Sequence, residues 1–329
     1  MKKYFVCTLI CLLFISCVDK EKDKTKFGLV IHGGAGVISN IPAEKEKEYI
    51  AKLNEAIEEG YKILEQGGNS LDAVETVIKI LEDCLLFNAG KGAVFNSDGI
   101  NELDASIMDG ATLNAGAITG VRRIKNPILL ARLVMEKSVH VLFTGEGAEK
   151  FAQEMGIDLI DPEYFYTEER WKSLEKAKEK EGQTQVSDKN FIYGTVGCVA
   201  LDKNGNLAAG TSTGGMTNKK FGRVGDSPII GAGTYANNKT CAVSCTGHGE
   251  YFIKNCVAYD VSALMEYKRM SLKDAAEYII NNKLKNQNAD GGLIGIDKFG
   301  NVTMPFNTSG MFRGYKLSDG KREVKIYKD

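Results

Sequence analysis

The chain has 329 residues, of which 43% are hydrophobic and 26% charged, as is ordinary for a soluble globular protein of one large or two smaller domains. Its formal net charge of -1 provides no basic field, so nucleic acid is not an expected partner. Three histidines limit histidine-based chemistry, and 36 glycines against 5 prolines favour a fold with many tight turns.

The first residues have the features of an export signal. Two lysines precede an apolar run over residues 4–15 that is too short to span a bilayer as a helix, so we predict a signal peptide at 1–16. The sequence Phe-Ile-Ser-Cys resembles a bacterial lipobox and makes Cys17 the expected lipidation site, although Phe14 stands where Leu is usual. The charged residues 17–26 are predicted to be a tether. We therefore expect an exported protein, periplasmic or membrane-anchored, that meets the membrane only through an N-terminal lipid.

Five cysteines lie beyond this segment, an odd number in apolar surroundings, which predicts buried free thiols rather than a disulfide framework. The spacing Cys241-x-x-x-Cys245-x-x-His248 leaves a zinc site as an alternative. Only three ligands and a strand-like spacing argue against it. The five residues are Cys84, Cys198, Cys241, Cys245 and Cys256.

Hydrophobic patterning predicts alternating strands and helices before residue 158. The β-branched run 27–31 predicts a strand that breaks into a glycine loop at His32–Gly36; the loop lacks the spacing of a phosphate-binding motif. Apolar residues at helical spacing predict one helix over 44–66, ended by Gly67, and a second capped by Asn69 or Ser70. The remaining predictions are a loop at 85–92, strands at 102–108, 111–121 and 139–143, and helices from Pro127 and over 146–155.

Residues 158–188 lose this periodicity and fill with Lys, Glu and Gln, so we predict a mobile linker at about 158–190. Beyond it we predict strands at 195–201, 207–213, 229–235, 241–245, 293–297, 302–305 and 324–327, and helices at 249–268 and 272–284. Strands and helices on both sides of Thr195 favour helices packed outside paired sheets. The expected fold class is a layered α+β domain over 27–329.

Thr195 begins an apolar, β-branched segment directly after the linker. A threonine hydroxyl is a poor nucleophile unless a base takes its proton, and one economical base is the residue's own α-amino group, freed by a cut before it. That amine has an ordinary pKa of about 7.7–8.0, close to working pH. A buried-strand threonine is the alternative for an isolated Gly-Thr pair.

Two further stretches carry polar groups suited to the same chemistry. Arg223 lies three residues before Asp226, so that the pair could hold the carboxylate and the ammonium of an amino acid. Thr246 and the N–H of Gly247 follow a strand and could face a developing oxyanion. The alternatives are a surface ion pair and an ordinary strand-to-helix turn.

A series of motifs in one order resembles the plant-type asparaginase/isoaspartyl peptidase family of N-terminal-nucleophile hydrolases. The similarity runs from about residue 27 to 315 and is loose over 158–190. The motifs are His32-Gly-Gly-Ala-Gly36, Phe87-Asn-Ala-Gly90, Glu102-Leu-Asp-Ala105, Met108-Asp-Gly110, Gly194-Thr-Val-Gly197, Thr211-Ser-Thr-Gly-Gly-Met-Thr-Asn-Lys219, Gly222-Arg-Val-Gly-Asp-Ser-Pro228, Gly231-Ala-Gly233, Tyr235-Ala-Asn-Asn238, Thr246-Gly-His-Gly-Glu250 and Pro305-Phe-Asn-Thr308.

The resemblance implies a four-layer αββα fold and a precursor that cuts itself between Gly194 and Thr195. The α subunit would end at 194, the β subunit would cover 195–329, and two such heterodimers would pair. Thr195 would be the nucleophile, with its freed amine as the base, and Thr213 would hydrogen-bond and tune it. Thr246 Oγ and the Gly247 N–H would form the oxyanion hole.

The resemblance also implies the substrate contacts. Arg223 would hold the substrate α-carboxylate, and Asp226 with the Gly249 carbonyl would hold its α-amino group. Asn88 would lie behind the nucleophile, and the His32–Gly36 loop would support self-cleavage.

No cofactor is implied for catalysis. A structural Na⁺ is expected on main-chain carbonyls near Leu81, Glu82, Cys84, Phe87, Ala89 and Lys91, with Lys91 standing where an apolar residue is familiar.

The function so implied is hydrolysis of the β-amide of isoaspartyl dipeptides and L-asparagine to release L-aspartate, through a β-aspartyl ester on Thr195. The nearest alternative is a glycosylasparaginase, which shares the nucleophile logic; the Gly-Thr-Val-Gly and Thr-Ser-Thr-Gly-Gly-Met-Thr-Asn-Lys motifs favour the isoaspartyl peptidase branch. A non-catalytic, lipid-anchored amino-acid-binding protein is the alternative from another class.

Overall fold

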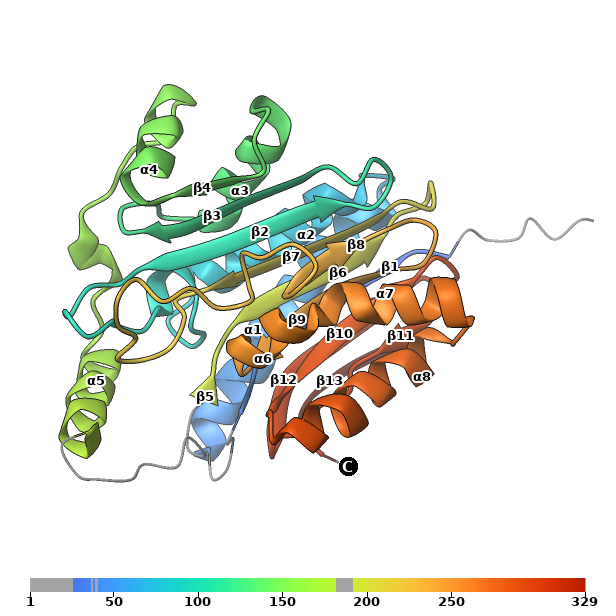
Figure 1. The fold of residues 1–329 in the computed structure, drawn as a ribbon. Coiled ribbons are helices and arrows are strands. Elements are labelled where there is room, and N and C mark those ends of the chain that lie inside the picture. The colour runs from blue at the N-terminus through green and yellow to red at the C-terminus, as the bar shows by residue number, and fades with distance from the viewer. Residues whose placement is uncertain (1–25, 37, 39–40, 182–191, 329) are drawn as a thin grey trace, which may run out of the picture.

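The computed structural model describes residues 26–36, 38, 41–181 and 192–328 (Figure 1). The signal peptide, the lipidation site at Cys17, all of the tether but Lys26, and the end of the linker lie outside these residues. Within the described ranges, no helix combines the length and apolar character needed to cross a membrane.

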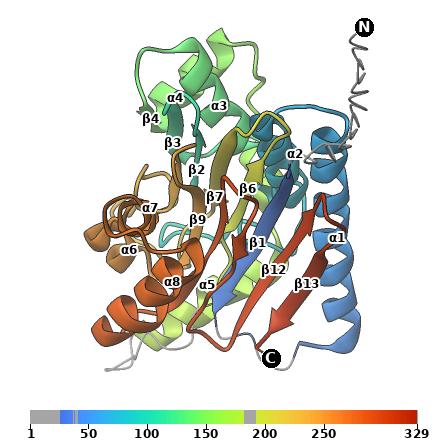
Figure 2. The ribbon, with the colours of Figure 1, turned by 90° about the vertical axis from the view of Figure 1, so that its right-hand side faces the viewer.

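Two stacked β-sheets form the middle of the molecule, and helices cover their outer faces (Figures 1 and 2). The large sheet has nine strands in the order β13-β12-β1-β6-β7-β2-β3-β4, with β5 pairing β1, and the small sheet has the order β11-β10-β9-β8. The strands of the large sheet are β1 (Gly28–Gly36), β2 (Leu103–Asp109), β3 (Ala115–Val121), β4 (Leu142–Thr144), β5 (Ile192–Tyr193), β6 (Val196–Leu201), β7 (Leu207–Thr213), β12 (Gly310–Leu317) and β13 (Arg322–Tyr327). Those of the small sheet are β8 (Thr234–Ala236), β9 (Cys241–Gly247), β10 (Gly291–Asp297) and β11 (Val302–Thr303).

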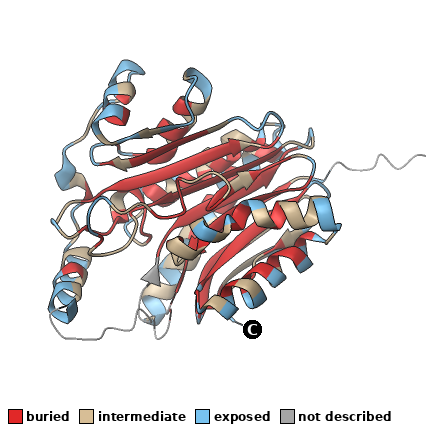
Figure 3. Ribbon diagram, viewed as in Figure 1, coloured by how far each residue is buried: buried red, intermediate tan, exposed pale blue. Residues whose placement is uncertain are grey.

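Three hydrophobic clusters separate the layers. One packs α1 (Ala43–Glu65), α2 (Ser70–Glu82), α3 (Pro127–Lys137) and α4 (Gly145–Glu154) on the large sheet. A second lies between the two sheets, and a third packs the small sheet on α6 (Gly249–Asn255), α7 (Val257–Lys268), α8 (Leu272–Glu277) and the π-helical turn η3 (Tyr278–Leu284). The central strands are therefore buried on both faces (Figure 3), and the layers run helix–sheet–sheet–helix as expected.

The first two helices confirm the sequence pattern. Helix α1 buries the apolar positions that recur at helical spacing, and α2 begins where the cap was predicted, because Asn69 accepts a hydrogen bond from the Asp72 N–H at 2.7 Å. Strands β6 and β7 form the predicted antiparallel hairpin.

The glycine loop predicted at His32–Gly36 is wrong, because these residues continue β1 with an irregularity between His32 and Ala35. Glycine lets the strand approach its neighbours: a Cβ on Gly33 would overlap the Phe87 ring and lie 3.1 Å from Phe312 Cβ.

The linker prediction is corrected in its first part, because 158–181 contains the short helix η2 (Pro162–Phe165) and α5 (Glu168–Glu181). Helix α5 is mostly exposed and buries Leu174 alone among its residues, so its apolar periodicity is weak.

Other predictions need smaller corrections. The strands predicted at 139–143 and 229–235 are shorter in the structure, where they are β4 and β8. The helix predicted at 249–268 is interrupted at Cys256, which has a left-handed φ of 48°. Strand β12 was missed, since glycines and the charged residues Arg313 and Lys316 interrupt its apolar positions, and its partner β1 is distant in sequence.

The five thiols are free, as predicted. Cys198, Cys241 and Cys245 are buried in the hydrophobic clusters, and Cys84 is half-buried. The predicted burial is wrong for Cys256, which is exposed at the break between α6 and α7.

A buried carboxyl joins three elements beneath β7. Glu82, at the end of α2, accepts hydrogen bonds from the Ser212 hydroxyl at 2.7 Å and from the Ile128 N–H at the start of α3 at 3.0 Å. Burial raises the pKa of Glu82 from 4.5 to about 8, against the lowering effect of these bonds.

Stability is expected to fall as the pH rises from about 4.5 to about 8, because the native protein retains a proton on Glu82 that the unfolded chain releases in this window. Glu82→Gln should remove this part of the pH dependence, worth roughly a few kcal/mol. Urea unfolding across the pH range measures it, with the exposed Glu65→Gln as the control. An unchanged slope in Glu82→Gln would contradict the assignment.

Candidate active site

Thr195 lies directly before β6, at the edge of the hairpin with β7, and is 8% exposed. Its hydroxyl donates to Thr213 Oγ1 at 3.1 Å, and Thr213 Oγ1 also accepts from the Gly215 N–H at 3.0 Å. The pairing of Val196 with Ser212 sets this register. The expected hydrogen bond between the two threonines is thus present.

Asn88 contacts the peptide bond between Gly194 and Thr195. The N–H of Asn88 donates to the Gly194 carbonyl at 2.9 Å, and a Cβ on Gly194 would lie 2.5 Å from Asn88 Cβ. The Asn88 side chain is itself fixed, because Nδ2 donates to the Gly215 carbonyl at 2.7 Å and Oδ1 accepts from the Val94 N–H at 3.0 Å. Asn88 therefore lies next to Thr195 and positions the Gly194 carbonyl.

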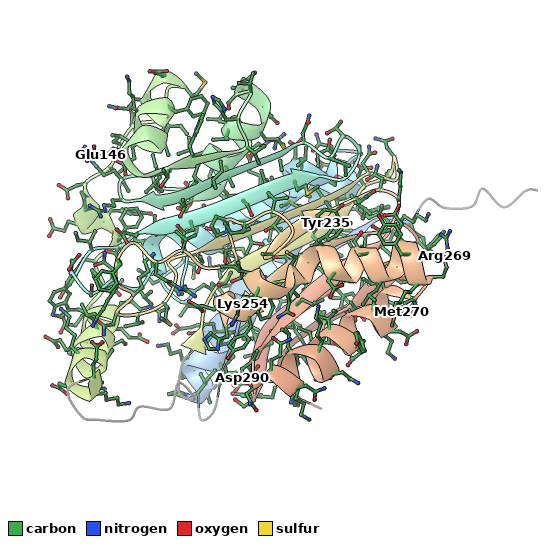
Figure 4. The ribbon with its side chains drawn as sticks, viewed as in Figure 1. Glu146, Tyr235, Lys254, Arg269, Met270 and Asp290 are labelled. Carbon is green, nitrogen blue, oxygen red and sulfur yellow. The ribbon has the colours of Figure 1, made fainter. Side chains whose placement is uncertain are left out.

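Thr246 and Gly247 lie at the end of β9 in the small sheet. Thr246 Oγ1 accepts from the Ala35 N–H of β1 at 3.3 Å, so this hydroxyl spans the gap between the sheets. The carbonyl of Asp290, labelled in Figure 4, accepts from the His248 N–H at 2.9 Å and lies 2.6 Å from the place of a Cβ on Gly247. A side chain at 247 is excluded by this close approach.

Arg223 is held by the carboxylate of Glu250. Its Nε and Nη2 donate to the two carboxylate oxygens of Glu250 at 2.8 and 3.0 Å, a bidentate pair between the loop after β7 and helix α6. Burial alone would raise the pKa of Glu250, but the hydrogen bonds and the positive charge of Arg223, with smaller contributions from neighbouring groups, together lower that pKa. Glu250 therefore holds the guanidinium in place, a role that sequence reasoning missed.

Asp226 stands free of this ion pair. It is buried, and its Oδ2 has no hydrogen-bond partner among the described residues. A Cβ on Gly249 would lie 2.9 Å from Arg223 Nη2 and 3.0 Å from Asp226 Oδ1, so the bare glycine leaves space that both groups line. An unpartnered buried carboxylate beside a guanidinium suits a zwitterionic ligand.

The loop after α2 brings several carbonyls together. A Cβ on Gly92 would contact the carbonyl oxygens of Phe87, of Leu85 at 2.8 Å and of Cys84 at 3.0 Å, while one on Gly90 would contact the carbonyl of Glu82. Carbonyl oxygens are the ligands of hard cations, so these are the groups that could hold the expected Na⁺.

The acidity of Asp226 predicts a pH dependence of binding. Burial raises its pKa to about 7, although the charge of Arg223 opposes the shift. Ionised Asp226 attracts an ammonium group and the protonated acid does not, so kcat/KM for an amino-acid substrate should rise as the pH rises through about 7. The pH profile of kcat/KM for Asp226→Asn should lack this rise, in contrast to that of the native enzyme. If the variant keeps the rise, another group titrates.

Comparisons with known proteins identify the family of this chain. A family model for asparaginase matches residues 25–326, and the chain belongs to this asparaginase family.

The chain is similar to curated isoaspartyl peptidases. The isoaspartyl peptidase of Escherichia coli (strain K12) is 51% identical over 309 residues, which cover 92% of this chain and 96% of that protein. The isoaspartyl peptidase/L-asparaginase of Mus musculus is 47% identical over 284 residues, 86% of each chain. The probable isoaspartyl peptidase/L-asparaginase 2 of Arabidopsis thaliana is 43% identical over 324 residues, 92% of this chain and 99% of that protein.

Proposed function

We propose that this chain is a hydrolase that cleaves the β-amide of isoaspartyl dipeptides and of L-asparagine to release L-aspartate. The observation that carries the proposal is the hydrogen bond between the hydroxyls of Thr195 and Thr213 in a chain of the asparaginase family. The carbonyl of Gly194, directly before Thr195, accepts a hydrogen bond from the Asn88 N–H. Its relatives from bacteria, animals and plants carry the name isoaspartyl peptidase.

In this proposal the bond between Gly194 and Thr195 is cut first, giving an α subunit that ends at 194 and a β subunit that covers 195–329. The N–H of Asn88 supports this step, because it already donates to the carbonyl of the bond that breaks. The freed amine of Thr195 then becomes available as a base.

The catalytic cycle is an acyl transfer. The Thr195 amine accepts the hydroxyl proton as Oγ1 forms a bond to the substrate β-carbonyl carbon, and Thr213 orients this hydroxyl. The developing oxyanion lies against Thr246 Oγ1 and the Gly247 N–H. The proton passes to the departing amine or ammonia as the C–N bond breaks, and water hydrolyses the β-aspartyl ester.

The amino-acid part of the substrate is held beside Gly249. Arg223, fixed by Glu250, binds the α-carboxylate; Asp226 and the Gly249 carbonyl bind the α-ammonium.

The test begins with intact mass and N-terminal sequencing of the purified protein. We expect a fragment that begins Thr-Val-Gly-Cys, together with aspartate release from an isoaspartyl dipeptide and from L-asparagine. A stable single chain that binds amino acids without releasing aspartate would favour the non-catalytic binding protein. Faster turnover of a glycosylated asparagine than of the isoaspartyl dipeptide would favour a glycosylasparaginase, which the names of the relatives above do not support.

We further propose that two αβ heterodimers associate. The exposed apolar residues Val139, Val141 and Leu142 at the edge strand β4 support a protein contact. Analytical ultracentrifugation of the processed protein distinguishes one heterodimer from two.

For the Na⁺ we propose the converging carbonyls of Cys84, Leu85 and Phe87, with Glu82 nearby. The ion would stiffen the loop that carries Asn88 and takes no part in the chemical step. Thermal unfolding in sodium and in tetramethylammonium buffers of equal ionic strength tests this.

Export is the last part of the proposal, with a signal peptide at 1–16, a lipid on Cys17 and a tether at 17–26. The sequence pattern alone supports it. Mass spectrometry of the membrane fraction, with Cys17→Ser as the control, would show the lipid.

A further inference from the structure

A chain of buried hydrogen bonds begins at the carbonyl of Thr195 and crosses between the two sheets. His32 Nδ1 lies 3.1 Å from the Thr195 oxygen, and His32 Nε2 lies 3.0 Å from Ser244 Oγ of β9. Both side chains are fully buried. This arrangement lies beside the nucleophile but outside the groups that would touch substrate.

The bonding partners fix the protonation of the ring. A carbonyl oxygen only accepts, so Nδ1 must carry the hydrogen that is donated to Thr195. In a neutral imidazole Nε2 is then an acceptor, and the Ser244 hydroxyl donates to it. Burial lowers the pKa of His32 to about 3, against the raising effect of the Thr195 carbonyl, which agrees with a neutral ring.

Hydrogen bonds from neighbouring hydroxyls orient the Ser244 hydroxyl so that it donates to the His32 ring. Since Ser244 gives its only hydrogen to His32, the 2.7 Å contact with Thr211 is a donation from Thr211, whose hydroxyl also lies 3.2 Å from the carbonyl oxygen of Gly233. Thr211 accepts in turn from Thr234 at 2.5 Å. At the far end Ser106 lies 2.8 Å from Thr234.

The last hydroxyl of this hydrogen-bonded series lies beside Ser227, next to the proposed substrate-binding residue Asp226. The single hydrogen of Ser106 Oγ is shared between Thr234 Oγ1 at 2.8 Å and the carbonyl of Ser227 at 2.6 Å, and Ser227 follows Asp226 directly. The hydroxyls of Thr211, Thr234 and Ser106 have no exposed surface, so water does not compete for their protons.

The absence of a side chain at Gly197 is explained by the same bond. Gly197 pairs with His32 across β6 and β1, and a Cβ on it would contact both Ser244 Oγ and His32 Nε2. The imidazole–hydroxyl bond therefore passes over the bare Cα of Gly197, two residues after the nucleophile.

We propose that His32 is a positioning residue for Thr195: its Nδ1–H, selected by the Ser244 hydroxyl on Nε2, holds the Thr195 carbonyl so that the hydroxyl faces Thr213. The inference rests on the proposed role of Thr195 as nucleophile. Once the bond before it is cut, Thr195 is a chain end ahead of the β6 ladder, which begins at Val196. The bond from His32 then restrains its carbonyl, and the orientation of the amine and hydroxyl with it.

The first experiment measures the tautomer. In protein labelled with 15N-histidine, the long-range 1H–15N spectrum should show a protonated Nδ1 and an unprotonated Nε2 for His32 at neutral pH. The signal is assigned by its loss in His32→Asn. A ring protonated at Nε2 in the native enzyme overturns the proposal.

Ser244→Ala tests the selection of the tautomer. Removing the donor to Nε2 should allow the other tautomer and lower kcat about 10- to 100-fold, with KM little changed, because misplacement of the nucleophile affects the chemical step. Ser262→Ala is the matched control, since Ser262 is also buried and hydrogen-bonded to a hydroxyl, that of Thr240 at 2.6 Å. If Ser244→Ala loses no more kcat than this control, the proposal fails.

Replacing the His32 ring by an amide tests the two ring nitrogens one at a time. The amide of His32→Asn can stand near Nδ1 and donate to the Thr195 carbonyl, whereas that of His32→Gln stands near Nε2. We expect His32→Asn to keep more self-cleavage and kcat than His32→Gln. The reverse order contradicts the proposal, and if neither variant folds, the tautomer spectrum and Ser244→Ala still decide it.

Two variants distinguish the role of Thr195 from that of His32. A Thr195→Ala protein with native activity overturns the nucleophile and leaves the tautomer result intact. An inactive Thr195→Ala beside a fully active Ser244→Ala overturns only the positioning role of His32.

Discussion

Replacing Thr195 by alanine should leave one uncut chain and lower kcat by about 10⁴-fold or more. The variant loses the hydroxyl that donates to Thr213, so neither the bond after Gly194 nor the substrate amide meets a nucleophile. Intact mass after long incubation measures the first effect, and aspartate release from an isoaspartyl dipeptide the second.

Two controls sharpen this experiment. Thr195→Ser keeps a hydroxyl and should retain cleavage and part of the activity. Thr240→Ala removes a buried threonine hydroxyl that bonds to Ser262 and should leave kcat near the native value. Wild-type aspartate release by Thr195→Ala would place the nucleophile elsewhere.

Arg223→Ala should reduce kcat/KM by about 100-fold, chiefly through KM. The change removes the cation proposed for the substrate carboxylate and leaves the carboxylate of Glu250, now without its bidentate partner, facing the same space. Steady-state kinetics with an isoaspartyl dipeptide measure it.

The matched variants separate charge from geometry. Arg223→Lys keeps the charge but cannot form both bonds to Glu250, so its KM should lie between those of the native enzyme and Arg223→Ala. Glu250→Gln weakens the ion pair and should raise KM less than Arg223→Ala does. An unchanged KM in Arg223→Ala would remove Arg223 from the substrate site.

The local sequence pattern was sufficient to predict a helix or strand wherever that element depends on residues close together in the chain. Helix α2 begins at the predicted cap because Asn69 and Asp72 are close in sequence, and the β6–β7 hairpin follows from two apolar runs around one turn. Strand β12 was not predictable in this way, since it depends on pairing with the distant β1. Helix α5 was missed because it buries so little apolar surface.

The amino-acid sequence alone establishes the order of the motifs, the position of Thr195 at the start of a strand, and the polar residues available to the site. Folding then selects which of these residues come into contact. Arg223 and Asp226 were expected to line one amino-acid site and both do so beside Gly249, but the fold also gives Arg223 a partner in Glu250 and leaves Asp226 Oδ2 without a hydrogen-bond partner among the described residues. Hydrogen bonds between the sheets, such as that from Ser244 to His32, join residues 212 positions apart, so only the stacking of β1 and β9 creates them. The physical reason is that side-chain identity is local, whereas burial, partner choice and the pKa shifts they cause depend on distant segments of the chain.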